Sequence, residues 1–352
     1  MTKKDIVWGF RLALIATALA SIVVVLGAFT RLADAGLGCP DWPGCYGHLT
    51  WPTTAEHVEA AEALFPEAPV EHDKTWPEMV HRHFAGTLGL LILGVTIFTW
   101  RKAATTGAAL PRWHTLGLLI LVIIQAAFGM WTVTLKLWPQ VVTAHLLGGF
   151  ATLSMLWLLA QRLGPWHWQT DQLRMLTGLK PLVVLGLFFV IVQIALGGWV
   201  SSNYAALACT DFPTCHGEWW PEMDVARGFN LTQTIGPNYL GGLLEGDART
   251  AIHMAHRMGA IVVTVTLLLL LRRLFKVRVA RSMTFVLLGV LLLQIVLGIT
   301  NVLAHLPLAV AVAHNAVGAV LLLCMVTLTH RVFTAQSSTT ISNDTSNRVA
   351  AS

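Results

Sequence analysis

The sequence contains few charged residues. Only 12% of its 352 residues are Asp, Glu, Lys or Arg, whereas 55% are hydrophobic, and the mean hydropathy is +0.65. A chain of this length would otherwise suggest two soluble domains, but this composition is typical of another class. It excludes a soluble protein and predicts an integral membrane protein, in which the net charge of +5 requires no nucleic-acid partner.

Eight apolar runs of about 20 residues follow one another along the chain, each long enough to cross a hydrocarbon core of ~30 Å. If both termini are cytoplasmic, sixteen of the 23 Lys and Arg residues lie inside and seven lie outside. Because cytoplasmic loops carry the excess of these residues, we predict a multi-pass protein of a bacterial-type inner (plasma) membrane with both termini in the cytoplasm. The runs are 11–30, 79–100, 114–135, 140–160, 181–202, 251–271, 282–303 and 309–329.

Cysteine is also rare, since the chain has only five. Four of them form two C-x5-C pairs, CPDWPGC and CTDFPTC, which lie 170 positions apart on the predicted outer side, where disulfides persist. This spacing is not that of a zinc site. The turn residues between the cysteines bring the sulfur atoms together, so we predict the disulfides Cys39–Cys45 and Cys209–Cys215. The fifth cysteine, Cys324, lies within the last run and is expected to be an inert packing residue.

The cysteine pairs belong to a longer internal repeat. Gly27 precedes Cys39 by twelve residues, and Gly197 precedes Cys209 by twelve. The third and seventh runs both contain the pattern Q-x3-G. Each half of the chain therefore holds one copy of a four-span unit.

The even number of spans in each unit determines how the two copies are related. Both copies have the same orientation, and the axis between them lies along the membrane normal. We predict an all-α integral membrane fold of eight transmembrane helices, arranged as two duplicated four-helix bundles related by a pseudo-two-fold axis. The predicted parts are an N-terminal half at 1–165, a C-terminal half at 166–334 and a Ser/Thr/Asn-rich tail at 335–352, which we expect to be disordered. The stretch TAEHVEAAEAL in the first outer loop predicts a short solvated helix.

Each four-span unit carries one His on its second helix and one on its fourth. HRHFAG begins at His81, and HRMGA begins at His256. His145 and His314 each follow the glycine of the Q-x3-G pattern by sixteen residues. A single intramembrane His usually hydrogen-bonds between helices, but four at duplicated depths near the outer face indicate a functional site. Cysteine is absent from these positions and carboxylates are scarce in the spans, so haem iron held by paired imidazoles fits better than zinc or a di-iron site.

Together these features resemble the haem A synthase family over residues 10 to 330. The resemblance comprises the repeated four-span unit, an ExxHR motif at 78–82, the four histidines in register and the two C-x5-C loops. It implies an oxidoreductase that oxidises a methyl group of haem O to a formyl group by successive hydroxylations, giving haem A for terminal oxidases. The implied partners are haem O as substrate, a haem O synthase, an electron donor and membrane lipid.

The resemblance also assigns the histidines. It implies that His81 and His145 ligate the substrate haem in the N-terminal half. It further implies a haem b cofactor in the C-terminal half, whose iron is ligated by His256 and His314.

The two halves differ beside the first histidine of each. Glu78 stands three residues before His81, and His253 stands three residues before His256. Positions i and i+3 share a helix face, so we expect Glu78 to point toward the same pocket as His81. Because the implied reaction requires deprotonations, Glu78 is the candidate catalytic residue, as a proton acceptor or a group that positions water. The alternative is a hydrogen bond to an imidazole or a helix end.

Two further features have two interpretations each. Arg82 and Arg257 directly follow a candidate ligand and either contact haem propionates or anchor their helices at the interface. The Cys39–Cys45 pair either staples its loop or has a redox role, toward which the resemblance leans.

Two other classes of protein could share these features. A di-haem b membrane electron-transfer subunit, linked to quinol, would use the same four histidines but would have two similar sites, against which Glu78 opposite His253 argues. A transporter would also have internal repeats, but its helices are commonly broken near the midplane. These spans lack paired Gly or Pro interruptions, and their polar residues cluster at the outer end.

Overall fold

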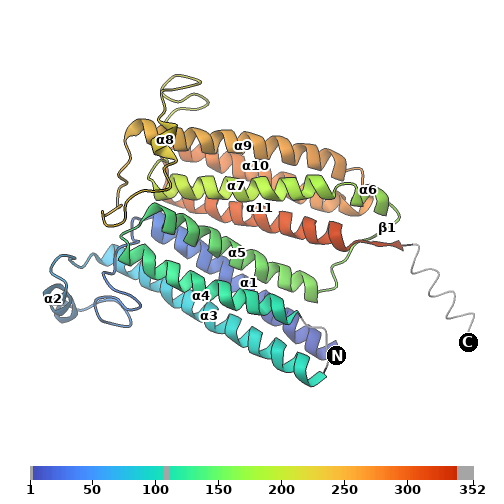
Figure 1. Ribbon diagram of the computed structural model, residues 1–352, viewed down its shortest axis with the longest axis horizontal. Coiled ribbons are helices and arrows are strands. Elements are labelled where there is room, and N and C mark those ends of the chain that lie inside the picture. Colours follow the sequence, from blue (N-terminus) through green and yellow to red (C-terminus); the bar gives the residue numbers. More distant parts are fainter. Residues whose placement is uncertain (1–2, 107–110, 339–352) are drawn as a thin grey trace, which may run out of the picture.

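The computed structural model describes residues 3–106 and 111–338. In this part of the chain, eight helices are long and apolar enough to cross a membrane, which confirms the eight predicted spans. α1 begins at the end of the molecule at which α11 finishes, and α2 and α8 lie at the opposite end (Figure 1). The eight helices are α1 (Lys3–Leu32), α3 (His72–Thr106), α4 (Arg112–Thr134), α5 (Pro139–Leu163), α7 (Lys180–Ser202), α9 (Gly246–Leu274), α10 (Arg281–Leu303) and α11 (Leu308–Thr334).

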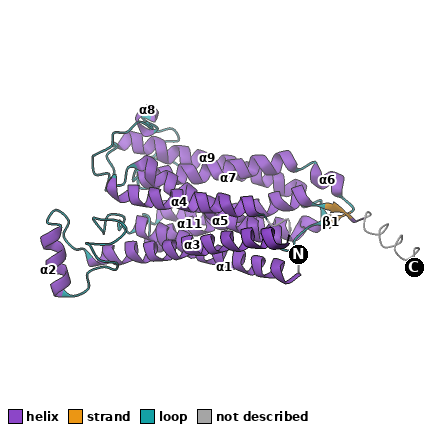
Figure 2. Cartoon of the chain, turned by 60° about the horizontal axis from the view of Figure 1, so that its bottom comes forward, coloured by secondary structure: helices purple, strands orange, loops and turns teal. Residues whose placement is uncertain are grey.

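The remaining elements are short and lie at the ends of the bundle (Figure 2). α2 (Ala55–Leu64) confirms the predicted solvated helix, and the hydroxyl of Thr54 caps it by accepting a hydrogen bond from the N–H of His57 at 3.3 Å. The others are α6 (Leu173–Thr177), α8 (Val225–Gly228), the 3₁₀ helix η1 (Arg278–Ala280) and the strands β1 (Gln169–Thr170) and β2 (Gln336–Ser337).

The first residues of the tail that we predicted to be disordered are ordered in the structure. Gln336 and Ser337 form β2 and pair in parallel with Gln169 and Thr170 of β1. The strand partner lies in the connection between the two halves, which the sequence pattern of the tail alone does not reveal. The rest of the predicted tail, 339–352, lies outside the described residues.

The spanning helices pack in two closed groups of four. In the first group, α1 and α4 both contact α3 and α5. In the second, α7 and α10 both contact α9 and α11. The first group lies within residues 1–165 and the second within 166–334. The groups meet where α5 packs on α7 and α11, and where α1 packs on α11.

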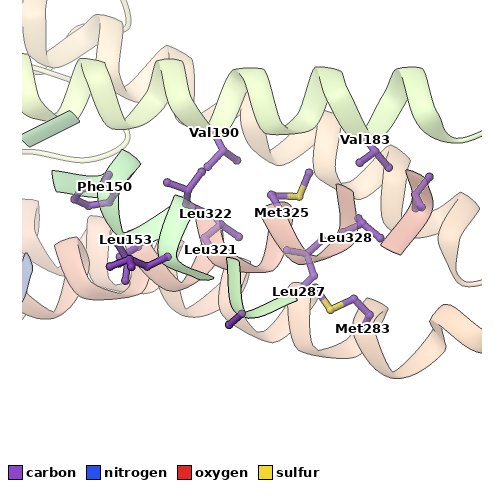
Figure 3. Close-up of a cluster of buried hydrophobic side chains, with 14 of the residues drawn as sticks. Phe150, Leu153, Val183, Val190, Met283, Leu287, Leu321, Leu322, Met325 and Leu328 are labelled. Carbon is purple, nitrogen blue, oxygen red and sulfur yellow. The ribbon is translucent and has the colours of Figure 1, made fainter. Parts of the chain in front are cut away.

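The interior of the bundle is filled by aliphatic and aromatic side chains from both groups (Figure 3). Because lipid chains are as apolar as leucine, such helices are held together by close packing and by hydrogen bonds between helices. Gly186 of α7 allows this approach, since a Cβ atom there would lie 3.0 Å from the terminal methyl of Met325. Outward side chains are apolar too, and Leu90 is 72% exposed, as expected for a lipid-facing surface.

Polar side chains connect the two groups inside the bundle. Trp157 Nε1 and Gln161 Nε2 of α5 donate to the hydroxyl of Thr327 on α11, at 2.7 and 2.8 Å. Nearer the other end, the hydroxyls of Thr143 and Ser202 lie 3.0 Å apart. These bonds satisfy polar groups that lipid could not, and therefore favour one arrangement of the two groups.

Candidate functional site

Each of the four candidate haem-ligating histidines packs its ring against a glycine on a neighbouring helix. A Cβ atom built on that glycine would come within 2.9 to 3.5 Å of ring atom Cε1. At Gly27, Gly197 and Gly298 this distance is 3.1 Å or less, so a larger residue would push the ring away, whereas at Gly129 it is an ordinary contact. The pairs are His81 with Gly27, His145 with Gly129, His256 with Gly197 and His314 with Gly298.

The structure brings the histidines together two by two. His81 of α3 is close enough to His145 of α5 for the two rings to interact electrostatically. His256 of α9 and His314 of α11 are related in the same way. Each pair lies within one helix group, as the repeat predicts.

Buried ring nitrogens of these histidines lack partners. Nδ1 of His81, of His145 and of His314 is buried and has no hydrogen-bond partner among the described residues. An unpaired polar atom inside a bundle is costly, so the described residues alone do not satisfy these three rings.

A haem fits this set of donors. Among residues 3–106 and 111–338, no group of three or more His, Cys, Asp or Glu side chains could hold a metal ion by itself. A haem supplies the equatorial nitrogens of its iron and needs only axial ligands from the protein, for which two imidazoles suffice. Each histidine pair could therefore hold one haem.

Two glutamines, which sequence analysis did not identify as site residues, contact the histidines of the second group. Nε2 of Gln193 lies 3.1 Å from Nδ1 of His256 and donates to the His256 carbonyl at 3.0 Å. Nε2 of Gln294 lies 3.3 Å from Nε2 of His314. The available signal for Gln193 was a lone amide in an apolar span, four residues before the glycine that packs on His256.

Glu78 points to the first disulfide loop, and not freely into the pocket beside His81 as we expected. It is buried, and its Oε2 accepts a hydrogen bond from the backbone N–H of Cys39 at 2.9 Å. Its Oε1 forms an ion pair with Nη2 of Arg82 at 2.5 Å. Both carboxylate oxygens are thus engaged, and the helix face shared with His81 is not what orients this side chain.

His253, at the position of Glu78 in the second group, makes a different contact. Its Nδ1 lies 3.0 Å from the carbonyl oxygen of Ala205, and the side chain is buried. A neutral imidazole donates to this carbonyl, whereas Glu78 accepts from an N–H. The two helix groups therefore differ in charge at this point.

Arg82 and Arg257 hold the two disulfide loops in place. Their guanidinium groups donate to backbone carbonyls of the loops, which supports the interpretation that they are anchors and specifies the loops as what they anchor. The contact to haem propionates remains a prediction. The accepting carbonyls are those of Asp41 and Gly44 for Arg82, and of Asp211 at 2.9 Å and Thr214 at 2.8 Å for Arg257.

Both predicted disulfides are confirmed. Cys39 is bonded to Cys45 and Cys209 to Cys215, with the paired Cα atoms 4.8 and 5.0 Å apart. All four cysteines are buried under their loops. The remaining cysteine, Cys324, is free and half-buried in α11.

The Asp and Gly that the two cysteine motifs share have a local structural role. The Asp41 carboxylate accepts hydrogen bonds from the N–H groups of Tyr46 at 2.6 Å and Gly47 at 2.8 Å. Gly47 has a φ of +76°, a left-handed conformation that favours glycine. In the second loop, Asp211 and Gly217 make the equivalent contact at 3.0 Å, and Gly217 has a φ of +77°.

Two side chains of the disulfide loops have shifted pKa values. The Thr214 hydroxyl, 2.6 Å from the Asp211 carboxylate, and the N–H of Gly217 hold the pKa of Asp211 well below its usual range. Burial, followed by the nearby negative charge of Glu71, raises the pKa of Tyr46 to about 12. The Tyr46 hydroxyl also donates to the carbonyl of Pro69 at 3.0 Å, so it remains protonated at neutral pH.

The fold and the site define a class: a multi-pass membrane protein of eight spanning helices, with two pairs of histidines packed against glycines. The chain belongs to the cytochrome oxidase assembly protein family (COX15-CtaA), whose model matches residues 10–326. This membership agrees with the resemblance found from the sequence motifs.

Similar proteins share the length of this chain as well. It is 46% identical over 335 residues to the heme A synthase of Shewanella oneidensis, covering 95% of this chain and 99% of the relative. The heme A synthase of Rhizorhabdus wittichii is 27% identical, with 90% and 92% covered. That of Sphingopyxis alaskensis is 28% identical, with 89% of each chain covered.

Proposed function

We propose that this protein is a haem A synthase, which oxidises a methyl group of haem O to a formyl group by successive hydroxylations and so supplies haem A for terminal oxidases. One observation of the structure carries the proposal: two pairs of histidines, each ring packed against a glycine, in which three of the four rings have a buried nitrogen without a partner in the described chain. The identity of 46% to a heme A synthase over nearly all of both chains supports it.

The two pairs have different tasks in this proposal. His256 and His314 hold a resident haem b, and His81 and His145 bind the substrate haem. The asymmetry of hydrogen bonding supports this division, since Gln193 contacts His256 and the equivalent residue beside His81 is Val23. When bound between two imidazoles, haem b supplies one-electron transfer.

Glu78 is the proposed proton acceptor of the first helix group. Hydroxylation followed by loss of water requires proton transfers, and Glu78 is the carboxylate three residues from His81. Each of its oxygens already accepts one hydrogen bond, from the Cys39 N–H or from Arg82, so uptake of a proton weakens these bonds. The first disulfide loop is therefore directly coupled to the protonation of this carboxylate.

The two helix groups are proposed to be copies of one ancestral bundle, divided at 165/166 and related by an axis along the membrane normal. Their equivalent helix contacts, loops and histidine–glycine pairs support this. With both termini in the cytoplasm of a bacterial-type inner membrane, the disulfide loops face the oxidising outer side. A haem O synthase and an electron donor complete the proposed set of partners.

Coexpression with a haem O synthase tests the proposal. The haems are extracted from the purified protein and from the membranes and separated by chromatography. A synthase yields haem A, together with haem O or a hydroxylated product. A di-haem electron carrier yields haem b alone, and that result would reject the proposed activity.

A further inference from the structure

One difference between the helix groups lies directly on a histidine ring. Gln193 of α7 contacts His256 through its amide nitrogen, 3.1 Å from Nδ1. Counting from the glycines that pack on the histidines, the equivalent residue of α1 is Val23, which has only backbone groups to offer His81. The His81 ring therefore interacts with a backbone group of Val23 and with no side-chain amide at that position, and its Nδ1 is buried without a hydrogen-bond partner among the described residues.

A second difference makes room for the first. A Cβ atom at Gly259 would lie 2.2 Å from Oε1 of Gln193, so any larger residue at 259 would displace this amide. Gly259 stands three residues after His256, and the residue three after His81 is Phe84. The positions that hold Gln193 and Gly259 in the second group hold Val23 and Phe84 in the first, where Phe84 is 38% exposed.

The amide of Gln193 can serve a metal-bound imidazole. When Nε2 of a histidine binds iron, Nδ1 carries the proton and needs an acceptor. Oε1 of Gln193 is buried and has no hydrogen-bond partner among the described residues. A rotation of the amide that presents Oε1 to Nδ1 gives up the present bond from Nε2 to the His256 carbonyl. An acceptor at this place fixes the ring orientation and increases the basicity of the ligand.

We infer that Gln193, admitted by Gly259, is the positioning residue that makes the second helix group retain its haem, whereas the first group, with Val23 and Phe84, releases its own. A resident cofactor must stay bound through many turnovers, and a substrate must exchange. The inference rests on the proposed function, because it explains how two similar histidine pairs can be divided into a cofactor site and a substrate site.

The test measures haem retention in the purified holoprotein. Transfer of haem b to excess apomyoglobin is followed spectroscopically, and the midpoint potential is measured by redox titration. Gln193→Leu is expected to lose haem b about 10- to 100-fold faster, the usual effect of removing such a partner, and to show a more positive potential. Gln161→Leu, which removes a buried glutamine that contacts Thr327 and no candidate ligand, is the matched control and is expected to change neither.

A conservative variant separates positioning from folding. Gln193→Glu keeps an acceptor for Nδ1–H and is expected to retain haem b with a potential below that of the wild type. A Gln193→Leu protein with wild-type loss rate and potential would overturn the inference. A Gln193→Glu protein with the wild-type midpoint potential would also overturn the inference. This second variant provides the test if the Gln193→Leu protein does not fold.

The reciprocal change tests the first group. Val23→Gln combined with Phe84→Gly is expected to slow the release of haem from His81 and His145, and Phe84→Gly alone is not. An unchanged release rate in the double variant would contradict the inference. Haem A formation is measured in parallel, so that the inference and the proposed activity can fail separately. If the protein makes haem A but its retention of haem b does not depend on Gln193, only this inference is overturned. If retention depends on Gln193 but no haem A is made, only the proposed activity is overturned.

Discussion

The backbone N–H of Cys39 donates a hydrogen bond to the carboxylate of Glu78 at 2.9 Å. This bond joins the first disulfide loop to the helix that carries His81. In the second helix group the direction of the bond is reversed, because His253 donates to the carbonyl of Ala205 at 3.0 Å. Only the first link can respond to a proton taken up by a carboxylate.

Glu78→Gln is predicted to lower the yield of haem A at least tenfold, which corresponds to about 1.4 kcal/mol of barrier and lies at or below the ~10²–10⁴ range of a positioned acid or base. The amide still accepts from the Cys39 N–H, but it loses the charge that pairs with Arg82 and cannot take a proton. Haem O or a partly hydroxylated product accumulates, as measured by chromatography of extracted haems.

His253→Gln is the matched control for that prediction. It changes the equivalent position in the group that we propose to transfer only electrons, so haem A formation is expected to fall less. Wild-type yield from the Glu78→Gln protein would mean that the carboxylate only anchors the loop.

His256→Ala is predicted to abolish the low-spin haem b spectrum of the purified protein, and His81→Ala is predicted to preserve it. The physical reason is that an iron held by two imidazoles cannot stay low-spin after one is removed. Optical spectra and haem-to-protein ratios check this. The opposite pattern in the two variants would exchange the roles of the helix groups.

Cys39→Ser is predicted to reduce haem A formation per folded protein, whereas Cys209→Ser is predicted to reduce mainly the amount of folded protein. Both variants lose a disulfide that closes a short loop. Only the first loop is bonded to Glu78, so only its loosening disturbs the proposed proton acceptor. Yields are compared after normalisation to haem b absorbance, and equal normalised yields would leave both disulfides as structural staples.

Gly197→Val is predicted to weaken haem b binding about tenfold, or about 1.4 kcal/mol. Even a single Cβ at this position would lie 3.1 Å from Cε1 of His256, and valine adds two further methyl groups. Gly289→Val on α10 is the control, because a Cβ there would meet nothing within 4 Å. The haem affinities of the two variants are compared by haem titration. Similar affinities would show that the His256 ring can move aside.

Asp211 is predicted to stabilise the second disulfide loop down to strongly acidic pH. Its folded pKa lies below the ordinary value of 3.8, so its contribution is fully present above that value and is lost only as the pH falls through the lower, folded pKa. Hydrogen exchange at the amides of His216 and Gly217, measured at decreasing pH, checks this. Asp211→Asn should show faster exchange already at neutral pH, and equal protection in both proteins would contradict the prediction.

Much of the fold was predictable because its signals are local. Runs of apolar residues specified eight helices, and C-x-D-x-P-x-C motifs specified two stapled loops whose Asp side chains bond the turn N–H groups. The direction of Glu78 was not predictable from helix periodicity. That periodicity gives the face of the helix, but Arg82 on the next turn and a loop N–H from another part of the chain compete for the side chain.

Gln193 escaped sequence analysis for a related reason. Alignment of the two halves directs attention to positions that agree and to those beside the histidines in sequence. Gln193 is 63 positions away from His256 in the chain and meets it only when α7 packs on α9. Such a contact depends on how the helices pack, which the positions of the two residues in the sequence do not reveal.

The pairing of β1 with β2 brings residues 169–170 next to 336–337. The chain therefore enters and leaves the second helix group at one point. A unit whose two ends lie together can be inserted into a longer chain, or removed from it, without separating the segments on either side.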